Sequence, residues 1–335
     1  MTTAQDNAIV LGKEADYNTA VTPARALPFV SEALNIRKEL KQSMALTVGS
    51  SIVRSAARRV VMLTTGAGPM EFELQTKGMG LLLEVCMGTA TNTVTTTPGL
   101  YQQVFTLGGT LPSLTVQKQL PSLKADGSGF DLNAFTFAGG TVEGFELTFP
   151  NADLVKLKVD CDFASVTDAT PAVTPLTYPS GAALYHFGGV CVKSGSIVAP
   201  TATALATADT ALARVKSMTL SVKHNLTGGM HACTGRSKPI PAVREISGTV
   251  VVEYVSGGPF VDAVMDDTSL ALMVNVAVGS AGEVFQALIS AAKLGDELPK
   301  ANAGQMIELS LPFEGLMPAS GEPLYLVSRT LDAAL

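Results

Sequence analysis

The sequence contains no tryptophan, and aromatic residues make up only 6% of its 335 positions. A ligand-binding face is usually furnished with exposed aromatic side chains, so this composition argues against an adhesion or carbohydrate-binding module. Charged residues are also few, at 16% compared with about 25% in average soluble domains. A surface short of charge is typical of a protein covered by other subunits, although a compact β-protein with a threonine-rich exterior would show it too.

Positive charge is in the minority. The formal net charge is −6 and the pI is near 5.2, whereas a protein that grips nucleic-acid phosphates carries a basic stripe. The sequence has no apolar run of about 18 residues, and its N-terminal residues lack the basic and apolar regions of a signal peptide. We therefore expect no specific nucleic-acid binding, no membrane span and no ordinary export signal.

Residues suited to catalysis or metal binding are sparse, with four cysteines, three histidines and no CxxC pair. The tightest cluster is His224, His231 and Cys233, whose spacing matches neither the HExxH nor the paired CxxC pattern, so loop histidines are favoured over a metal site. A P-loop and a GxSxG elbow are absent. We predict a protein that is not an enzyme and needs no cofactor, with buried free thiols typical of a reducing cytoplasm.

Residues 135–163 carry the clearest structural pattern in the chain. Apolar and polar residues alternate before the turn-forming sequence PNAD and again after it, as at Leu157, Val159 and Cys161. A period of two is typical of a strand with one buried and one solvent-facing side. We predict a β-hairpin here.

A related pattern near the C-terminus indicates an internal repeat. Apolar residues alternate in the same way in both stretches, and we match them in order: Leu157, Val159, Cys161 and Phe163 with Ile307, Leu309, Leu311 and Phe313. Residues 43–48 are expected to form a strand, residues 217–222 repeat its form, and the elements between follow the same order. The starts of the two copies, at residues 43 and 217, are 174 residues apart, and their ends, at residues 163 and 313, are 150 residues apart. The first copy therefore holds about 24 extra residues, which fit in its threonine-rich loops.

The resulting fold prediction is all-β, with two tandem β-sandwich or barrel-like domains that each carry a short flanking α-helix. The helices are expected over residues 78–88, ending at Gly88, and over residues 260–266. The expected division is an extended N-terminal arm over 1–42, domain 1 over 43–165, a linker with one strand over 166–213, and domain 2 over 214–335. Long loops are expected over 49–68 and 223–245.

The chain resembles the major tail tube protein of long, non-contractile phage tails. The resemblance rests on LGKEADYNTAVTP, GPMEFELQTKGMGLLLEVCMG, LYQQVFTLGG, SLTVQ, VEGFELTFPNADLVKLKVDCDF, AVREISGTVVVEY and SLPFEGL. It implies β-sandwich domains in rings of six, hairpins that join neighbours into a barrel, and arms that reach the adjacent ring. It also implies a structural virion protein of the tail, assembled in the host cytoplasm, with tape measure, tail terminator and tail tip proteins as partners and double-stranded DNA passing through the lumen without specific binding.

Two alternatives stay open at this point. Two tube domains per chain would give three chains per ring, whereas an illusory repeat or a decorating second unit would require six. An adhesion or carbohydrate-binding β-sandwich of a phage tail or cell surface is the competing function, and a hydrolase ranks third because a catalytic constellation is missing.

Two groups of charged residues are candidates for function. The polar sides of the hairpins are candidates for the lumen, against the alternative of an ordinary solvated strand face: Glu146, Lys156, Lys158, Asp160, Asp162 and Glu308. The long loops are candidates for docking on acidic residues of the next ring, against the alternative of ordinary loop charge. The basic residues are Arg54, Arg58, Arg59, Arg236, Lys238 and Arg244, and the acidic ones Asp262, Asp266 and Asp267.

Overall fold

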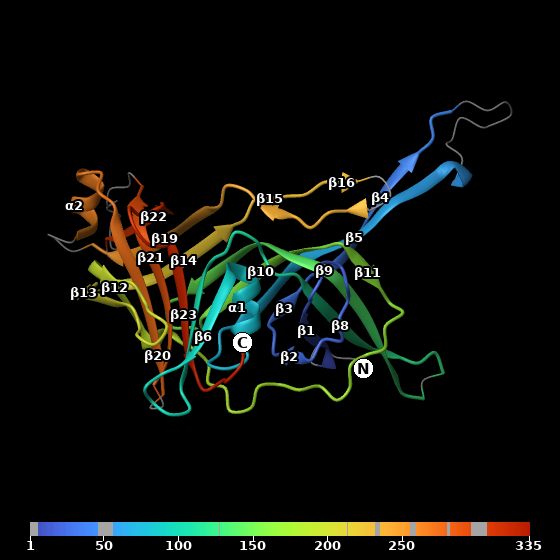
Figure 1. Cartoon of the computed structure of the whole chain (residues 1–335), viewed down its shortest axis with the longest axis horizontal. Helices are drawn as coiled ribbons and strands as arrows, with labels where there is room; N and C mark the ends of the chain where they lie inside the picture. The colour runs from blue at the N-terminus through green and yellow to red at the C-terminus, as the bar shows by residue number, and fades with distance from the viewer. Residues whose placement is uncertain are drawn as a thin grey trace.

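The computed structural model describes residues 6–45, 56–126, 128–212, 214–231, 235–254, 259–279, 282–295 and 307–335. The described chain is almost entirely β, with two short α-helices, which confirms the all-β prediction (Figure 1). Its strands form one central sheet that runs through both halves of the chain and outer strands that cover it.

The central sheet is antiparallel throughout and begins at an edge made of two short, consecutive strands. In spatial order it comprises β3 (Ser31–Glu32) and β4 (Asn35–Gln42), then β5 (Arg59–Glu73), β10 (Lys156–Phe163), β9 (Phe130–Phe149), β14 (Val215–Lys223), β19 (Glu245–Glu253) and β22 (Glu308–Gly315). The pairing of β9 with β14 joins the first half of the chain to the second.

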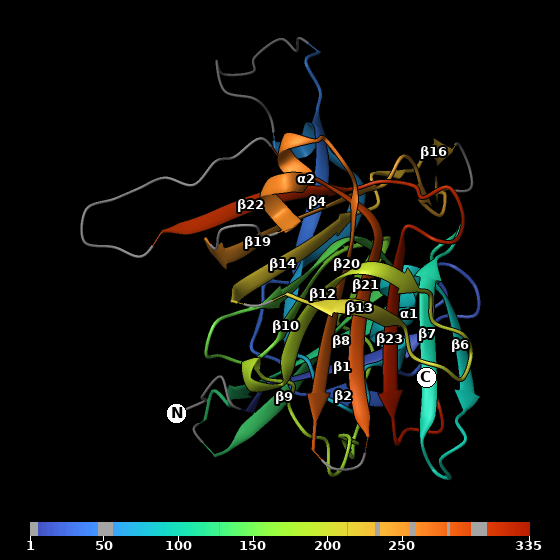
Figure 2. The same cartoon turned by 90° about the vertical axis from the view of Figure 1, so that its left-hand side faces the viewer.

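The outer strands pack on the inner side of this sheet. In the first half they are β2 (Arg25–Leu27), β1 (Ala8–Lys13), β8 (Leu114–Leu123), the N-terminal part of β9, and β11 (Ser165–Thr167). In the second half they are β13 (Thr207–Ala211), β12 (Val190–Val198), β20 (Leu270–Val278), β21 (Glu283–Leu294), β23 (Leu324–Thr330), β7 (Tyr101–Leu107) and β6 (Gly88–Val94), of which β20, β21, β23, β7 and β6 stand side by side in Figure 2.

Alternation along the strands explains the two faces of the central sheet. Phe145, Leu147, Leu157 and Val159 point inward and are fully or almost fully buried, whereas the residues between them face outward. The inward side chains of both halves form one continuous apolar core. The hairpin predicted over residues 135–163 therefore exists and lies at the centre of the molecule.

Both predicted helices are present. α1 (Gly80–Met87) is apolar except for Glu84, which forms a salt bridge with Lys13, and the strands around it bury every residue except Leu81. It ends at Gly88, whose φ of 96° requires glycine. α2 (Pro259–Met265) covers the second half and buries Phe260 and Ala263.

The expected N-terminal arm is wrong for residues 8–42. β1 is a short, continuously apolar strand that pairs with β8 and β2, and Ile9 within it is fully buried. β3 and β4 then pair with β5. The stretch 166–213, expected to be a linker with one strand, contains both β12 and β13 as well as the end of β11.

The strand expected over residues 43–48 and the loop expected over 49–68 are also placed differently. Residues 43–45 are not a strand, and residues 46–48 lie outside the described residues. After the short 3₁₀ helix at Ala56–Arg58, strand β5 already begins at Arg59 and continues for 15 residues. Much of the predicted loop is therefore one side of a long hairpin.

The two halves share one pattern of strand pairing. In the first half β1 pairs with β2 and β8, β8 with β9, β9 with β10 and β11, and β10 with β5. In the second half β12 pairs with β13 and β20, β20 with β21, β21 with β22 and β23, and β22 with β19. The β6–β7 hairpin, which follows α1, has no equivalent after α2, where β20 begins at once.

Candidate tube-lining face and hairpin arms

The outward side of the central sheet is rich in charge, and we call it the polar face. All six candidate lumen residues lie on it, because cross-strand partners share a side: Lys158 is opposite both Glu71 and Glu146, and Glu308 is opposite Glu253. The acidic residues of the face include Glu71, Glu73, Glu146, Asp160, Asp162, Glu245, Glu253, Glu308 and Glu314, and the basic ones include Arg37, Lys156, Lys158, Lys216 and Lys223. The face therefore carries an excess of negative charge.

Local ion pairs neutralise only part of that excess. Lys216 forms a salt bridge with Glu308 and lies 3.8 Å from Glu253. The hydrogen bond that Lys216 donates to the carboxylate of Glu308 raises the pKa of Lys216. Lys156 lies 3.6 Å from Asp153, in the turn that joins β9 to β10. Solvent reaches each of these pairs and screens it, so they contribute little to stability.

Two long hairpins project from the central sheet in the same direction (Figure 1). Arm 1, residues 36–66, consists of β4 and the first part of β5 around its tip. Arm 2, residues 222–246, carries two small two-stranded ladders, β15 (Leu226–Thr227) with β18 (Ile240–Pro241) and β16 (Met230–His231) with β17 (Gly235–Arg236). Arm 2 crosses above the first half toward β4 and β5, whereas arm 1 extends beyond the body of the chain.

A salt bridge fastens arm 2 to the first half. The guanidinium of Arg236 binds the carboxylate of Asp162 through both terminal nitrogens, with Nη1 3.2 Å from Oδ1, and Nη1 also donates to the carbonyl of Phe163 at 3.3 Å. Both charged side chains are mostly buried. Such a two-point contact fixes orientation as well as distance.

The base of arm 2 is held by a buried histidine. Nε of Arg244 donates to Nδ1 of His224 at 3.1 Å, so Nε2 carries the proton and donates to the Cys86 carbonyl of α1 at 2.8 Å. Arg244 also donates to the carbonyl of Gly108. Burial first, and the Arg244 charge second, lower the pKa of His224 to about 4. The imidazole is therefore neutral at pH 7 and links arm 2 to α1.

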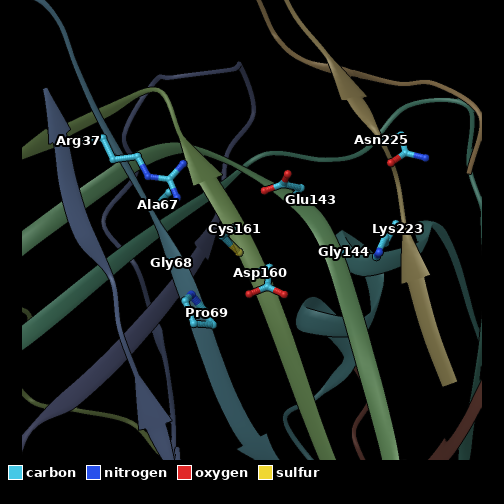
Figure 3. Close-up of a pocket in the computed structure, with 10 residues that line it drawn as sticks. All are labelled: Arg37, Ala67, Gly68, Pro69, Glu143, Gly144, Asp160, Cys161, Lys223 and Asn225. Atoms are coloured by element: carbon cyan, nitrogen blue, oxygen red, sulfur yellow. The ribbon is translucent and has the colours of Figure 1, made fainter. Parts of the chain in front are cut away.

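A pocket lies between arm 1 and the base of arm 2, and Figure 3 shows the side chains around it. Arg37, Glu143, Asp160 and Lys223 bring charges of both signs to its rim. Cys161 at its floor is buried, and burial raises the pKa of the thiol, so it stays protonated and unreactive. The pocket offers mixed charge without an activated nucleophile.

The described residues contain no group of three or more His, Cys, Asp or Glu side chains that could hold a metal ion. His224 has both nitrogens engaged, His231 is exposed on β16, and Cys233 lies outside the described residues. None of the described helices is long and apolar enough to cross a membrane.

The structure divides the predicted docking residues into two groups. Arg236 and Arg244 are bound within the chain, which their loop positions in the sequence did not reveal, and Lys238 is half-buried beside them. Arg59 is exposed on arm 1, and Arg58 beside it is half-buried and donates from Nη1 to the carbonyl of Ala45 at 3.4 Å, while Arg54 lies outside the described residues.

The predicted acidic partners also differ from one another. Asp267 pairs with Lys293, whereas Asp262 and Asp266 are exposed on and just after α2. Sequence reasoning missed five further acids of the polar face, Glu71, Glu73, Glu245, Glu253 and Glu314, although the alternation within their strands would have found them.

Comparison with known proteins identifies the family of the chain. A search of curated proteins finds no match. The sequence profile of a family described as phage tail tube protein matches residues 4–315, which is nearly the whole chain and includes both halves of the central sheet. The chain therefore belongs to the phage tail tube protein family, a family of structural virion proteins.

Proposed function

We propose that this protein is the major tail tube subunit of a phage with a long non-contractile tail, and that its copies assemble into stacked rings whose lumen conducts the genome. The observation that carries the proposal is the central sheet itself. It runs unbroken through both halves, has a charged polar face, and ends at β3 and β4, whose outer side pairs with no other described strand.

An open strand edge invites pairing with another chain. β4 is eight residues long, and most of its side chains are exposed, including Ile36 and Leu40. Continuation of the sheet from one copy into the next would close the sheet around an axis and leave no edge exposed. This closure supports a ring, because β4 is an open edge in each copy, and β22 at the other end of the sheet pairs with β21 only along its last residues among the described ones.

The polar face suits a channel for DNA. Acidic side chains outnumber basic ones on this face and oppose adsorption of phosphates, and the interspersed basic residues keep the surface from becoming uniformly repulsive. On this reading five of the candidate lumen residues line the tube, Glu146, Lys156, Lys158, Asp160 and Glu308, whereas the sixth, Asp162, is covered by arm 2 and neutralised by Arg236.

The shared pairing pattern of the two halves supports two tube domains per chain, and thus three chains in a ring of six domains. In this proposal the first domain comprises strands β1 to β5 and β8 to β11 with α1, and the second comprises β12 to β14, β19 to β23 and α2. Membership of the family further supports tail localisation after assembly in the host cytoplasm, with tape measure, terminator and tail tip proteins as partners.

Negative-stain electron microscopy of the concentrated protein, with averaging of end-on views, tests this function. Hollow rings or tubes with threefold symmetry modulated to six are the expected result, and sixfold rings would refute three chains per ring while keeping the function. A protein that stays monomeric at every concentration, alone and with purified tail tip complex as initiator, would contradict the proposal.

A further inference from the structure

The pairing ladders make Glu314 the counterpart of Asp162. The first residue of β10 is opposite Glu73, the last residue of β5, and the next helix after β5 is α1. The first residue of β22 is likewise opposite Glu253, the last residue of β19, and the next helix after β19 is α2. Asp162 and Glu314 are each the seventh residue of their strand. Both lie on the polar face, but only Asp162 has an ion-pair partner among the described residues.

The same ladders align the two arms. Leu40 is opposite Val61 in arm 1, and Leu226 is opposite Pro241 in arm 2. The two leucines thus occupy equivalent places, and the small β15–β18 ladder corresponds to part of the β4–β5 ladder. The arms are two versions of one element, with arm 1 the longer.

Alignment of the arms locates the counterpart of Arg236. Arg236 precedes Pro241 by five residues, so its equivalent in arm 1 is Ala56, five residues before Val61. Arg58 is only two residues further along, and Arg59 follows it at the start of β5. Arm 1 therefore has guanidinium groups next to the place where arm 2 has the one that binds Asp162.

What lies beneath the two arms differs. Arm 2 rests on the first half of its own chain, where Arg236 reaches Asp162. Arm 1 projects beyond the body (Figure 1), and six of its apolar side chains remain exposed, by 38% to 73% of their area: Ile36, Leu40, Met44, Val60, Val61 and Met62. They lie on both sides of the arm, and apolar side chains that the chain does not cover itself are typical of an interface.

We propose that arm 1 lies across β22 of the adjacent copy in the same ring, where Arg58 and Arg59 bind Glu314 as Arg236 binds Asp162 within the chain. This inference rests on the proposed self-assembly and specifies one contact in it. It assigns the arm 1 arginines to contacts within a ring, whereas the sequence had suggested contacts between rings.

Charge complementarity supports a second copy as the occupant. Arm 1 is basic, with one acid among its described charged residues against five bases: Arg37, Lys38, Lys41, Arg58 and Arg59. The surface that would receive it is acidic on balance, with Glu308 and Glu314 on β22 and Asp262 and Asp266 by α2, against Lys216, which binds Glu308, and Lys293, which lies opposite Glu314. Opposite charges brought together over an apolar contact set register and partner choice.

The first test is a charge exchange followed by electron microscopy and sedimentation. Glu314→Arg is expected to raise the concentration needed for tube formation about tenfold or more, the effect of losing about 1.4 kcal/mol per contact. Adding Arg58→Glu and Arg59→Glu to the same chain should restore assembly. Glu146→Arg, which makes the same charge change on an exposed part of the polar face away from the arm, is the matched control.

The second test separates contacts within a ring from contacts between rings. In a background with Cys191→Ser and Cys233→Ser, the pair Arg58→Cys and Glu314→Cys is oxidised in assembled tubes and run on a non-reducing gel. Cross-linked products should stop at the number of chains in one ring. A ladder that continues past that number, or tubes that give no cross-link, would overturn the inference.

The outcomes distinguish this contact from the general function. If wild-type protein forms tubes but Glu314→Arg behaves like Glu146→Arg, or if the charge exchange fails to restore assembly, the contact is refuted and the tube function stands. If wild-type protein forms no tube even with an initiator, the proposed function fails, and the contact fails with it.

Discussion

The buried imidazole of His224 predicts a specific loss of stability in mild acid. Its neutral form is required because Nδ1 must accept the hydrogen bond that Nε of Arg244 donates, while Nε2 donates to the Cys86 carbonyl. Protonation would place a donor against a donor, next to a guanidinium, in a site with no exposure to solvent. We expect acid to weaken the attachment of arm 2 to α1.

The size of the effect follows from proton linkage. The pKa of His224 is about 4 in the folded protein and about 6.5 in the unfolded chain. Between these values the unfolded chain binds more protons, so stability is unaffected above about pH 6.5 and falls as pH drops through this window by up to about 1.4 kcal/mol per unit. The expected loss from His224 is about 2 kcal/mol at pH 5 and about 3 kcal/mol below pH 4.

Urea denaturation at pH 7 and pH 5 measures this loss when wild type is compared with His224→Gln. Glutamine can still donate to the Cys86 carbonyl but does not titrate, so the variant should lose about 2 kcal/mol less than wild type between the two pH values. Carboxylates titrate alike in both proteins and cancel in the comparison. Equal pH dependence in the two proteins would refute the assignment of the buried neutral imidazole.

Two further substitutions test the central sheet, and each has a matched control. Gly248→Ala would place a Cβ 2.1 Å from the carbonyl oxygen of Thr219, so we expect a lower urea midpoint and a loss of stability of about 1–3 kcal/mol or more. In Gly109→Ala the added Cβ meets nothing within 4 Å, so stability should change by less than about 0.5 kcal/mol. Leu157→Ala should cost about 2–5 kcal/mol because the side chain of Leu157 is fully buried, whereas Lys158→Ala, at the next residue, should cost less than about 0.5 kcal/mol by the same measurement. Similar losses at both positions would contradict the assignment of the two faces.

Sequence patterns predicted the central hairpin and both helices because their signals are local. Period-two alternation marks which side of β10 is buried, and Gly88 marks the end of α1. A pattern with a period of two looks the same after a shift of two residues, so it does not fix how the two copies of the repeat align with each other. The sequence matched Leu157 with Ile307, whereas both Leu157 and Leu309 are the second residue of their strand.

The N-terminal strands escaped prediction for a different physical reason. β4 has the sequence NIRKELKQ, is exposed on both sides, and is held in place by hydrogen bonds to β5. Because neither side is buried, its sequence does not show the alternation of apolar and polar residues that predicts a strand. β1 is short and apolar throughout, a pattern that does not separate a buried strand from other structures.

The contacts of arm 2 were beyond sequence reasoning because they join distant parts of the chain. Asp162 and Arg236 are 74 residues apart, and His224 is 138 residues from Cys86. His224 looked like a loop histidine because only packing of the second half against the first buries it. No local spacing encodes that contact.

The antiparallel ladder between β9 and β14 has a further consequence, in terms of effective concentration. Because one polypeptide carries both strands, this seam forms without the loss of translational and rotational freedom that association of two molecules entails. A seam of the same geometry between separate chains would lack that advantage and would depend on protein concentration. Substitutions along the β9–β14 seam should therefore be tolerated better than equivalent changes at the open edge of β4.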